Sequence, residues 1–159
     1  MNWPDVLLWG FIATSVQTGL EAGSQRLGLS RISIPFVLGT VFTANRDRAA
    51  LIGFGTHLLN GWLVSLLYAA VFRSLGENDP WIGLILGVVH GLLTLLVVAP
   101  LLPAVHPRMA SEHQAPDPRR TLEPPGWLAL NYGRWTALST LAGHAVFGVI
   151  LGSFYHLPA

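Results

Sequence analysis

An uncharged run at residues 51–72 constrains the fold more than any other feature of the chain. These 22 residues would form about 33 Å of α-helix, enough to cross the hydrocarbon core of a bilayer. His57 lies inside this run, with Gly53 and Gly61 one helical turn to either side. An imidazole ring is costly in hydrocarbon, so we expect His57 to face protein rather than lipid.

The composition indicates a membrane protein. The chain of 159 residues is 52% hydrophobic and only 11% charged, whereas charged residues make up about 25% of ordinary soluble domains. Four apolar stretches use most of its length, so we predict one all-α integral membrane domain over residues 1–159, a four-transmembrane-helix bundle in the lipid bilayer. The predicted helices cover about residues 5–24, 49–73, 81–102 and 135–155.

Two segments between these helices differ from them in composition. Residues near 33–45 hold an apolar piece at Pro35 that is too short to span, which predicts a short interfacial segment. Residues 103–134 are rich in proline and are predicted to form an extended, irregular loop, with Pro100 and Pro103 ending the third helix.

Three histidines lie outside the predicted helices. His106 and His113 fall in the proline-rich loop, and His156 lies near residue 159. We expect all three to be solvated side chains at the membrane interface.

The residue types that are missing exclude several kinds of chemistry. There is no cysteine, which excludes disulfides, iron–sulfur clusters and thiolate metal sites. All nine basic residues are arginine, so no lysine is present for Schiff-base chemistry or a phosphate-binding loop. A net charge of +1 provides no field to attract nucleic acid. No residue pattern specifies a reaction, which leaves open whether the chain is an enzyme.

The arginines predict the orientation of the chain. Those between the first and second helices are Arg26, Arg31, Arg46 and Arg48, and those between the third and fourth are Arg108, Arg119, Arg120 and Arg134. Arg73 stands alone between the second and third helices. By the positive-inside rule both long links are cytoplasmic and both termini lie outside.

A weak internal repeat indicates two tandem helical hairpins. The pattern H-x3-G-x6-Y occurs twice, as His57, Gly61 and Tyr68 and again as His144, Gly148 and Tyr155. Duplication of this kind is known among membrane proteins. The alternative is a chance similarity, because apolar helices share a small set of residues.

Each predicted helix carries one stripe of small and polar residues, so the polar faces are expected to meet inside the bundle. His57, His90 and His144 lie seven to ten residues into their helices, within about 6 Å of the midplane. Gln17 shares their level, and Glu21 is one turn nearer the cytoplasmic end. The predicted polar lining consists of Gln17, Asn60, Thr94, Tyr68 and Tyr155.

This cluster suggests a haem or metal site. Three imidazoles with one carboxylate, from His57, His90, His144 and Glu21, make a plausible divalent metal site. Alternatively, His57 and His144 bracket a haem iron, and Gly61 and Gly148 leave room for the macrocycle. The leading hypothesis is a redox or metal-handling membrane subunit that binds haem b or a divalent metal.

Structural explanations compete with that hypothesis. An interior histidine can instead hydrogen-bond a side chain of a neighbouring helix, which stabilises the bundle by about 0.6 kcal/mol. The spacing of Gly83, Gly87 and Gly91 indicates close helix packing rather than a ligand slot. Glu21 is expected to snorkel or to pair with Arg26 or Arg48.

Two further classes of function remain open. The chain could be a cofactor-free accessory subunit in contact with other membrane subunits. It could also self-associate into a small oligomeric transporter or channel, since intramembrane Glu and His residues mark proton and solute paths.

Three segments resemble uncharacterised four-transmembrane-helix bacterial membrane proteins. These are FTANRDRA at residues 42–49, LLPAVHPRMASE at 101–112 and LEPPGWLALNYGRWT at 122–136. The resemblance implies the fold and a bacterial inner membrane location. That family has no assigned activity, so no functional residue is carried over.

The predicted orientation can be tested with single cysteines, because the chain has none of its own. Ser74→Cys should react with an impermeant maleimide in intact cells, and Ala115→Cys should react only after permeabilisation. Labelling of Ala115→Cys but not Ser74→Cys in intact cells would reverse the orientation.

Overall fold

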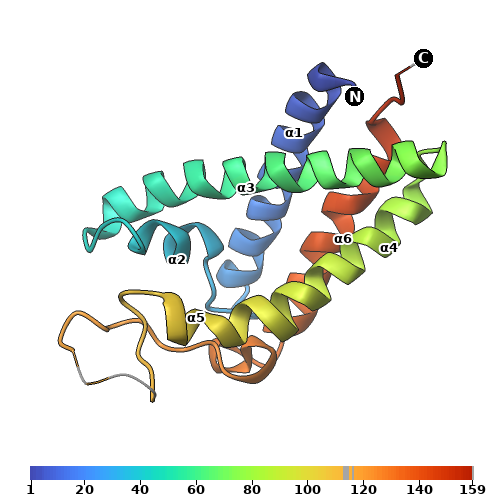
Figure 1. Ribbon diagram of the computed structural model, residues 1–159. Helices are drawn as coiled ribbons and strands as arrows, with labels where there is room; N and C mark the ends of the chain where they lie inside the picture. The colour runs from blue at the N-terminus through green and yellow to red at the C-terminus, as the bar shows by residue number, and fades with distance from the viewer. Residues whose placement is uncertain (113–114, 116, 159) are drawn as a thin grey trace.

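The computed structural model describes residues 1–112, 115 and 117–158, and in these residues all regular structure is helical (Figure 1). His113 and Pro116, within the predicted loop, lie outside the described residues. The α-helices are α1 (Trp3–Arg26), α2 (Ile34–Thr40), α3 (Arg46–Leu75), α4 (Pro80–Leu93), α5 (Ala99–Val105) and α6 (Thr136–Phe154). A π-helical segment, η1 (Thr94–Val98), joins α4 to α5, and a 3₁₀ segment, η2 (Trp127–Tyr132), precedes α6.

Three helical stretches are long and apolar enough to cross a membrane. They are Arg46–Leu75, Pro80–Val105 and Thr136–Phe154. They agree with three of the four predicted spans. The fourth prediction corresponds to α1, which is a continuous helix of 24 residues but is not among these candidates. Its buried stripe includes Gln17 and Glu21, which lower its mean hydropathy.

The helix starts follow signals that are readable in the sequence. The side chains of Asn2, Asn45 and Asp79 cap α1, α3 and α4, each by accepting a hydrogen bond from a backbone N–H of the first turn. Gly76 ends α3 in the left-handed conformation, with φ of 76°. These caps explain why the helix limits lie within a few residues of the predicted ones.

The expected stop at Pro100 and Pro103 is wrong, because the helical path continues to Val105. The path changes to π-helical geometry at Thr94–Val98 and resumes as α5, in which Pro100 occupies the first turn and Pro103 the interior. A proline lacks the N–H that a helix interior needs, and local π adjustments accommodate such interruptions in apolar helices. The loop predicted from residue 103 therefore begins after residue 105.

Close backbone contacts between glycines hold α4 against α6. A Cβ atom added to Gly83 would collide with the Gly148 carbonyl oxygen, and one added to Gly148 would collide with that of Gly83. Gly87 faces the backbone of His144 in the same way. The stripe Gly83, Gly87 and Gly91 therefore serves close helix packing, as its spacing predicted.

The helices α1, α2 and α3 complete the fold beside the α4–α6 pair (Figure 1). α1 packs against both α3 and α6, whereas α3 runs away from α4 after the turn that joins them. α2 lies on the N-terminal half of α3, where Gly39 meets the Ala49 backbone and Gly53 meets the Pro35 backbone. The short segment predicted near 33–45 is thus a helix packed on protein.

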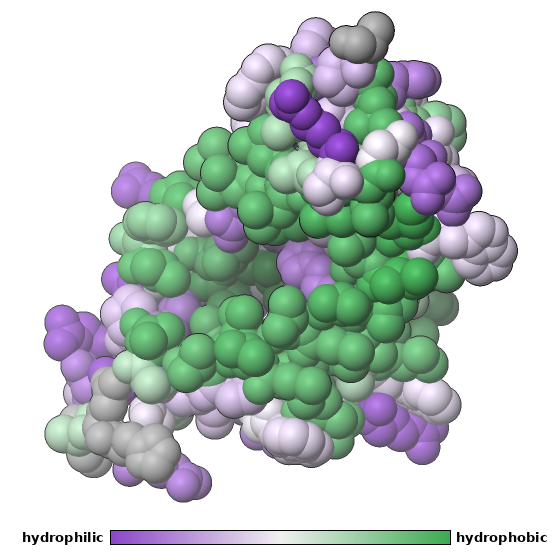
Figure 2. Space-filling view, turned by 45° about the vertical axis from the view of Figure 1, so that its right-hand side comes forward, coloured by the Kyte–Doolittle hydropathy of each residue, from purple (hydrophilic) through white to green (hydrophobic). Residues whose placement is uncertain are grey.

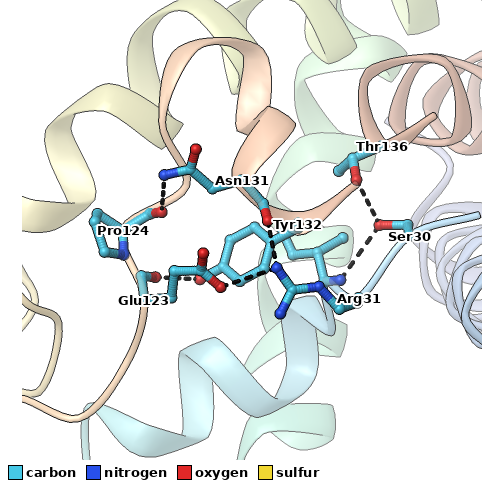
Figure 3. A network of polar contacts seen from close by, with 8 residues as sticks. Ser30, Arg31, Glu123, Pro124, Asn131, Tyr132 and Thr136 are labelled. Carbon is cyan, nitrogen blue, oxygen red and sulfur yellow. Dashed lines mark hydrogen bonds and ion pairs between the residues drawn. The ribbon is translucent and has the colours of Figure 1, made fainter. Parts of the chain in front are cut away.

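The described residues between α5 and α6 hold more regular structure than the predicted irregular loop. They contain η2 and an isolated bridge between Met109 and Leu122. Figure 3 shows how they are fastened to the link after α1, where Arg31 donates to the Glu123 carboxylate at 3.1 Å. The Arg31 backbone N–H also donates to the Tyr132 carbonyl oxygen at 2.7 Å. Within the segment between α5 and α6, the Tyr132 hydroxyl donates to the Glu123 carbonyl oxygen at 2.5 Å. Burial, with a contribution from the Glu123 charge, raises the pKa of Tyr132 to about 12.

The prediction that His106 is solvated is wrong. The residue is only 3% exposed, and its Nδ1 accepts a hydrogen bond from the Arg108 backbone N–H at 3.1 Å. Its Nε2 therefore carries the proton, which it donates to the Val37 carbonyl oxygen at 3.0 Å. His156 is exposed as expected and pairs with Asp5 at 2.8 Å.

The glycine contacts predict a large effect of one methyl group. Gly83→Ala should destabilise the protein by about 1–3 kcal/mol, because the added Cβ overpacks the α4–α6 backbone contact. Thermal unfolding in detergent measures the effect. Gly55→Ala is the matched control, since nothing lies within 4 Å of a Cβ at that position. Equal unfolding temperatures for the two variants would contradict the packing described here.

Candidate intramembrane cavity

A cavity of about 360 Å³ lies where α1, α3, α4, η1 and α6 approach one another. α2, α5 and η2 also contribute to its wall. It touches members of two separate core clusters, Phe147 in one and Ile32, Leu95 and Ala129 in the other. Figure 2 shows a hollow bordered by hydrophobic side chains, with hydrophilic atoms visible inside it.

The structure brings most of the predicted site residues to this cavity. Those that line it are Gln17, His57, Asn60, Gly61, His90, Thr94 and His144. They come from four helices and from η1. The three imidazoles predicted to share one depth therefore share one cavity.

Four of the predicted residues lie elsewhere. Tyr68 and Tyr155 belong to the core cluster that contains Phe147, and Tyr155 also contacts the N-terminus through Asn2 and Met1. Gly148 is occupied by the backbone contact with Gly83, so it leaves no space for a macrocycle. Glu21 is buried outside the cavity and forms no ion pair with Arg26 or Arg48, so the expected pairing is wrong.

His144 is the most firmly positioned of the three histidines. It is 5% exposed, and its Nδ1 lies 2.8 Å from the Thr140 carbonyl oxygen, which can only accept. Nδ1 therefore carries the proton, and Nε2 presents a lone pair. The Gln17 amide nitrogen lies 3.3 Å from Nδ1 and 3.5 Å from Nε2, and the Thr94 hydroxyl lies 3.3 Å from Nε2. The Thr94 hydroxyl already donates to the His90 carbonyl oxygen, so only the long Gln17 contact serves this lone pair.

His90 lies against His144 but has a free nitrogen. The two rings meet edge to face, with centroids 4.5 Å apart. The Nδ1 atom of His90 is buried without a hydrogen-bond partner in the described structure. The same is true of Nε2 of His57. A buried polar atom without a partner costs about 1–3 kcal/mol, so either ring gains hydrogen-bonding energy if it turns this nitrogen toward a polar group in the cavity.

Small residues allow the histidine-bearing helices to approach one another. Gly91 lies under the side chain of His144, where an added Cβ would come within 3.2 Å of the His144 Cβ. Gly61 faces the hydroxyl of Thr14 on α1, so it acts as a packing residue as well as a lining residue.

The residues do not form a ready-made metal centre. Within the part of the chain that the structure describes, no group of three or more His, Cys, Asp or Glu side chains is placed to hold a metal ion. The carboxylate of Glu21, predicted as a fourth ligand, is not at the cavity.

The apolar half of the wall was not anticipated. Ile32, Ile34, Val37 and Leu38 reach the cavity from α2 and the link before it, and Phe147 reaches it from α6. Phe147 follows His144 by three residues, so on a helix the two side chains lie on the same face, and this spacing could have predicted Phe147 at the cavity. The contribution of α2 depends on how a seven-residue helix docks on α3, and no local pattern encodes that docking.

Comparison with known proteins found no significant match to any protein family, curated protein or solved structure. The function must therefore be inferred from the cavity itself.

The hydrogen bonds predict opposite tautomers for two buried histidines. In ¹⁵N NMR spectra of the imidazoles, His144 should be protonated at Nδ1 and His106 at Nε2. His106→Gln assigns the second signal by removing it. Protonation of His144 at Nε2 would show that the Thr140 carbonyl does not hold the ring.

Proposed function

We propose that the chain is an integral membrane protein in which α1 crosses the bilayer with the three candidate spans, as a four-helix bundle of two tandem hairpins. Two observations support this arrangement. The exposed side of α1 is apolar, with Leu7, Leu8 and Phe11, while its polar stripe faces α3 and α6. Its 24 residues extend about 36 Å, enough to cross the hydrocarbon core.

The orientation follows from the arginines. We propose a bacterial inner membrane location with the two long links in the cytoplasm and both termini outside. The exposed Arg31–Glu123 ion pair joins the two long links. Both links therefore lie on the same side of the bilayer, which supports this orientation.

The proposed function is the binding of a small, largely apolar molecule in the cavity, with its polar end held by the histidines. One observation carries this proposal: imidazoles from three helices meet in a cavity that is otherwise mainly apolar, and two of them keep unpartnered buried nitrogens. Apolar pockets with a few convergent polar groups are the usual form of a ligand site.

The polar groups indicate an uncharged ligand with oxygen atoms. No Asp, Glu, Lys or Arg side chain lines the cavity among the described residues, so a charged group would be desolvated there without a partner. The available donors are imidazole N–H groups and the amides of Gln17 and Asn60. A carbonyl-bearing ring with an apolar tail, as in a quinone, fits this set of donors.

A metal-centred ligand is the second candidate, favoured by the geometry of His144. Ligating histidines commonly donate one N–H to a carbonyl and present the other nitrogen to the metal. His144 meets the first of these conditions through the Thr140 carbonyl oxygen. Haem iron requires only one or two imidazoles, whereas a divalent ion held by His57, His90 and His144 requires the rings to move. In this candidate the chain is a redox or metal-handling subunit.

Two proposals without a bound ligand compete with these. One is an accessory subunit in contact with other membrane proteins, and the other is a transporter formed by self-association. The accessory subunit attributes the polar stripes to helix packing alone, whereas the transporter uses the intramembrane Glu and His residues as a path for protons or solutes. Both predict that the purified protein binds neither a quinone nor a haem.

Binding to protein held in lipid nanodiscs tests the proposal, with decylubiquinone as the uncharged probe, haemin as the metal-centred one and empty nanodiscs as background. His57→Leu and His90→Leu keep bulk but remove a hydrogen-bonding nitrogen, so each should weaken quinone binding by about 3- to 10-fold. His156→Leu is the matched control because that ring is exposed on the surface.

The outcomes separate the proposals. Saturable quinone binding that both cavity variants weaken supports the uncharged ligand. Haemin binding with a Soret band that depends on His144 supports the metal-centred one. If neither probe binds saturably, the cavity does not have the proposed function.

A further inference from the structure

The cavity is closed on the sides where its helices pack. Between α4 and α6, Gly87 lies against the backbone of His144. Between α1 and α3, Gly61 meets the Thr14 hydroxyl, and between α1 and α6 a Cβ added to Gly143 would come within 3.3 Å of the Gln17 side chain. Helices that approach this closely leave no passage for a ligand at these three contacts.

The end of the cavity next to the long links is closed as well. α2 is fixed to α3 by direct backbone contacts at Gly39 and Gly53. Ile32, from the link before α2, packs in one cluster with Ala129 of η2 and Leu95 of η1. An aqueous route from that end would have to separate these elements.

The side of the cavity between α3 and α4 is the remaining place for an opening. These helices diverge after the turn that joins them, and the hollow in Figure 2 is bordered by hydrophobic side chains. Leu63 of α3 and Val98 of η1 line the cavity, yet they are 61% and 50% exposed. Residues that line a cavity and are also this exposed mark its opening.

The opening lies between two candidate membrane spans, so it faces hydrocarbon. The residues around the opening are apolar and exposed, as a lipid-facing surface requires, because Leu59 and Leu67 flank Leu63 on α3 and are exposed too. Asn60 adds a polar group at this position, where it is exposed and lines the cavity. A polar side chain facing lipid is costly unless it meets a polar partner, and the head of a passing ligand would supply one.

We infer that the ligand reaches the cavity sideways from the lipid phase, through an opening between α3 and α4 bordered by Leu63 and Val98. This inference rests on the proposed function, because it requires that the cavity binds a ligand. It also defines the ligand further. The polar end passes Asn60 to reach the histidines, and the apolar tail remains at the opening in contact with lipid.

A reversible closure of the opening tests this route, and the absence of native cysteine makes it specific. The double variant Leu63→Cys/Val98→Cys is treated with a bis-maleimide whose spacer contains a disulfide, and decylubiquinone association is followed in nanodiscs. The cross-linked protein should bind at least about tenfold more slowly, and reduction of the spacer should restore the rate. Each single-cysteine variant, treated identically, carries a maleimide adduct without closing the opening, so each should bind faster than the cross-linked double variant.

The result separates the route from the function. If the cross-linked protein binds as fast as the reduced protein while His57→Leu and His90→Leu still weaken binding, the ligand uses another route and the inference is wrong. If the histidine variants bind like the unaltered chain, the proposed function itself fails. Recovery on reduction shows that slow binding is not caused by misfolding.

Discussion

The structure depends on the direct backbone contact between α4 and α6. Within a bilayer there is no hydrophobic drive to bring helices together, so association relies on close packing and on interhelical hydrogen bonds. Gly83 and Gly148 allow the two backbones to touch, and Gly87 and Gly91 continue the contact to the level of His144. That approach brings the rings of His90 and His144 to a centroid distance of 4.5 Å. The pairing of the His90 and His144 rings at the cavity is therefore a consequence of the glycine contacts.

The three cavity histidines differ in how completely their ring nitrogens are hydrogen-bonded, and this difference connects structure with function. His144 has its proton directed to the Thr140 carbonyl oxygen. His57 and His90 each keep a buried nitrogen without a partner in the described residues. Helix packing alone explains why polar side chains turn inward, but it leaves these two nitrogens unpaired. A ligand that pairs with them removes a cost of about 1–3 kcal/mol for each nitrogen. Binding at this position would therefore stabilise the protein as well as hold the ligand.

The sequence allowed the helices and the inward placement of His57, His90 and His144 to be predicted, because helical periodicity is a local property. It failed where distant packing decides the outcome. His106 appeared solvated in a proline-rich stretch, yet the docking of α2 surrounds it and supplies the Val37 carbonyl oxygen. Pro103 appeared to end a helix that a π-helical segment continues. Gly61 and Gly148 matched as a repeat, but only Gly61 lines the cavity, because Gly148 is used in the α4–α6 contact.

Histidines from separate helices meet in one cavity, which we place within the bilayer. Solid-state NMR of uniformly ¹³C-labelled protein in lipid bilayers measures this most directly, through correlations between ring carbons. The described geometry predicts ring-to-ring cross-peaks between His90 and His144, because their centroids lie 4.5 Å apart. His90→Leu should remove these cross-peaks and leave those of His106 unchanged. Spectra that show Gly83–Gly148 contacts but no correlation between the two rings would contradict this arrangement of the histidines.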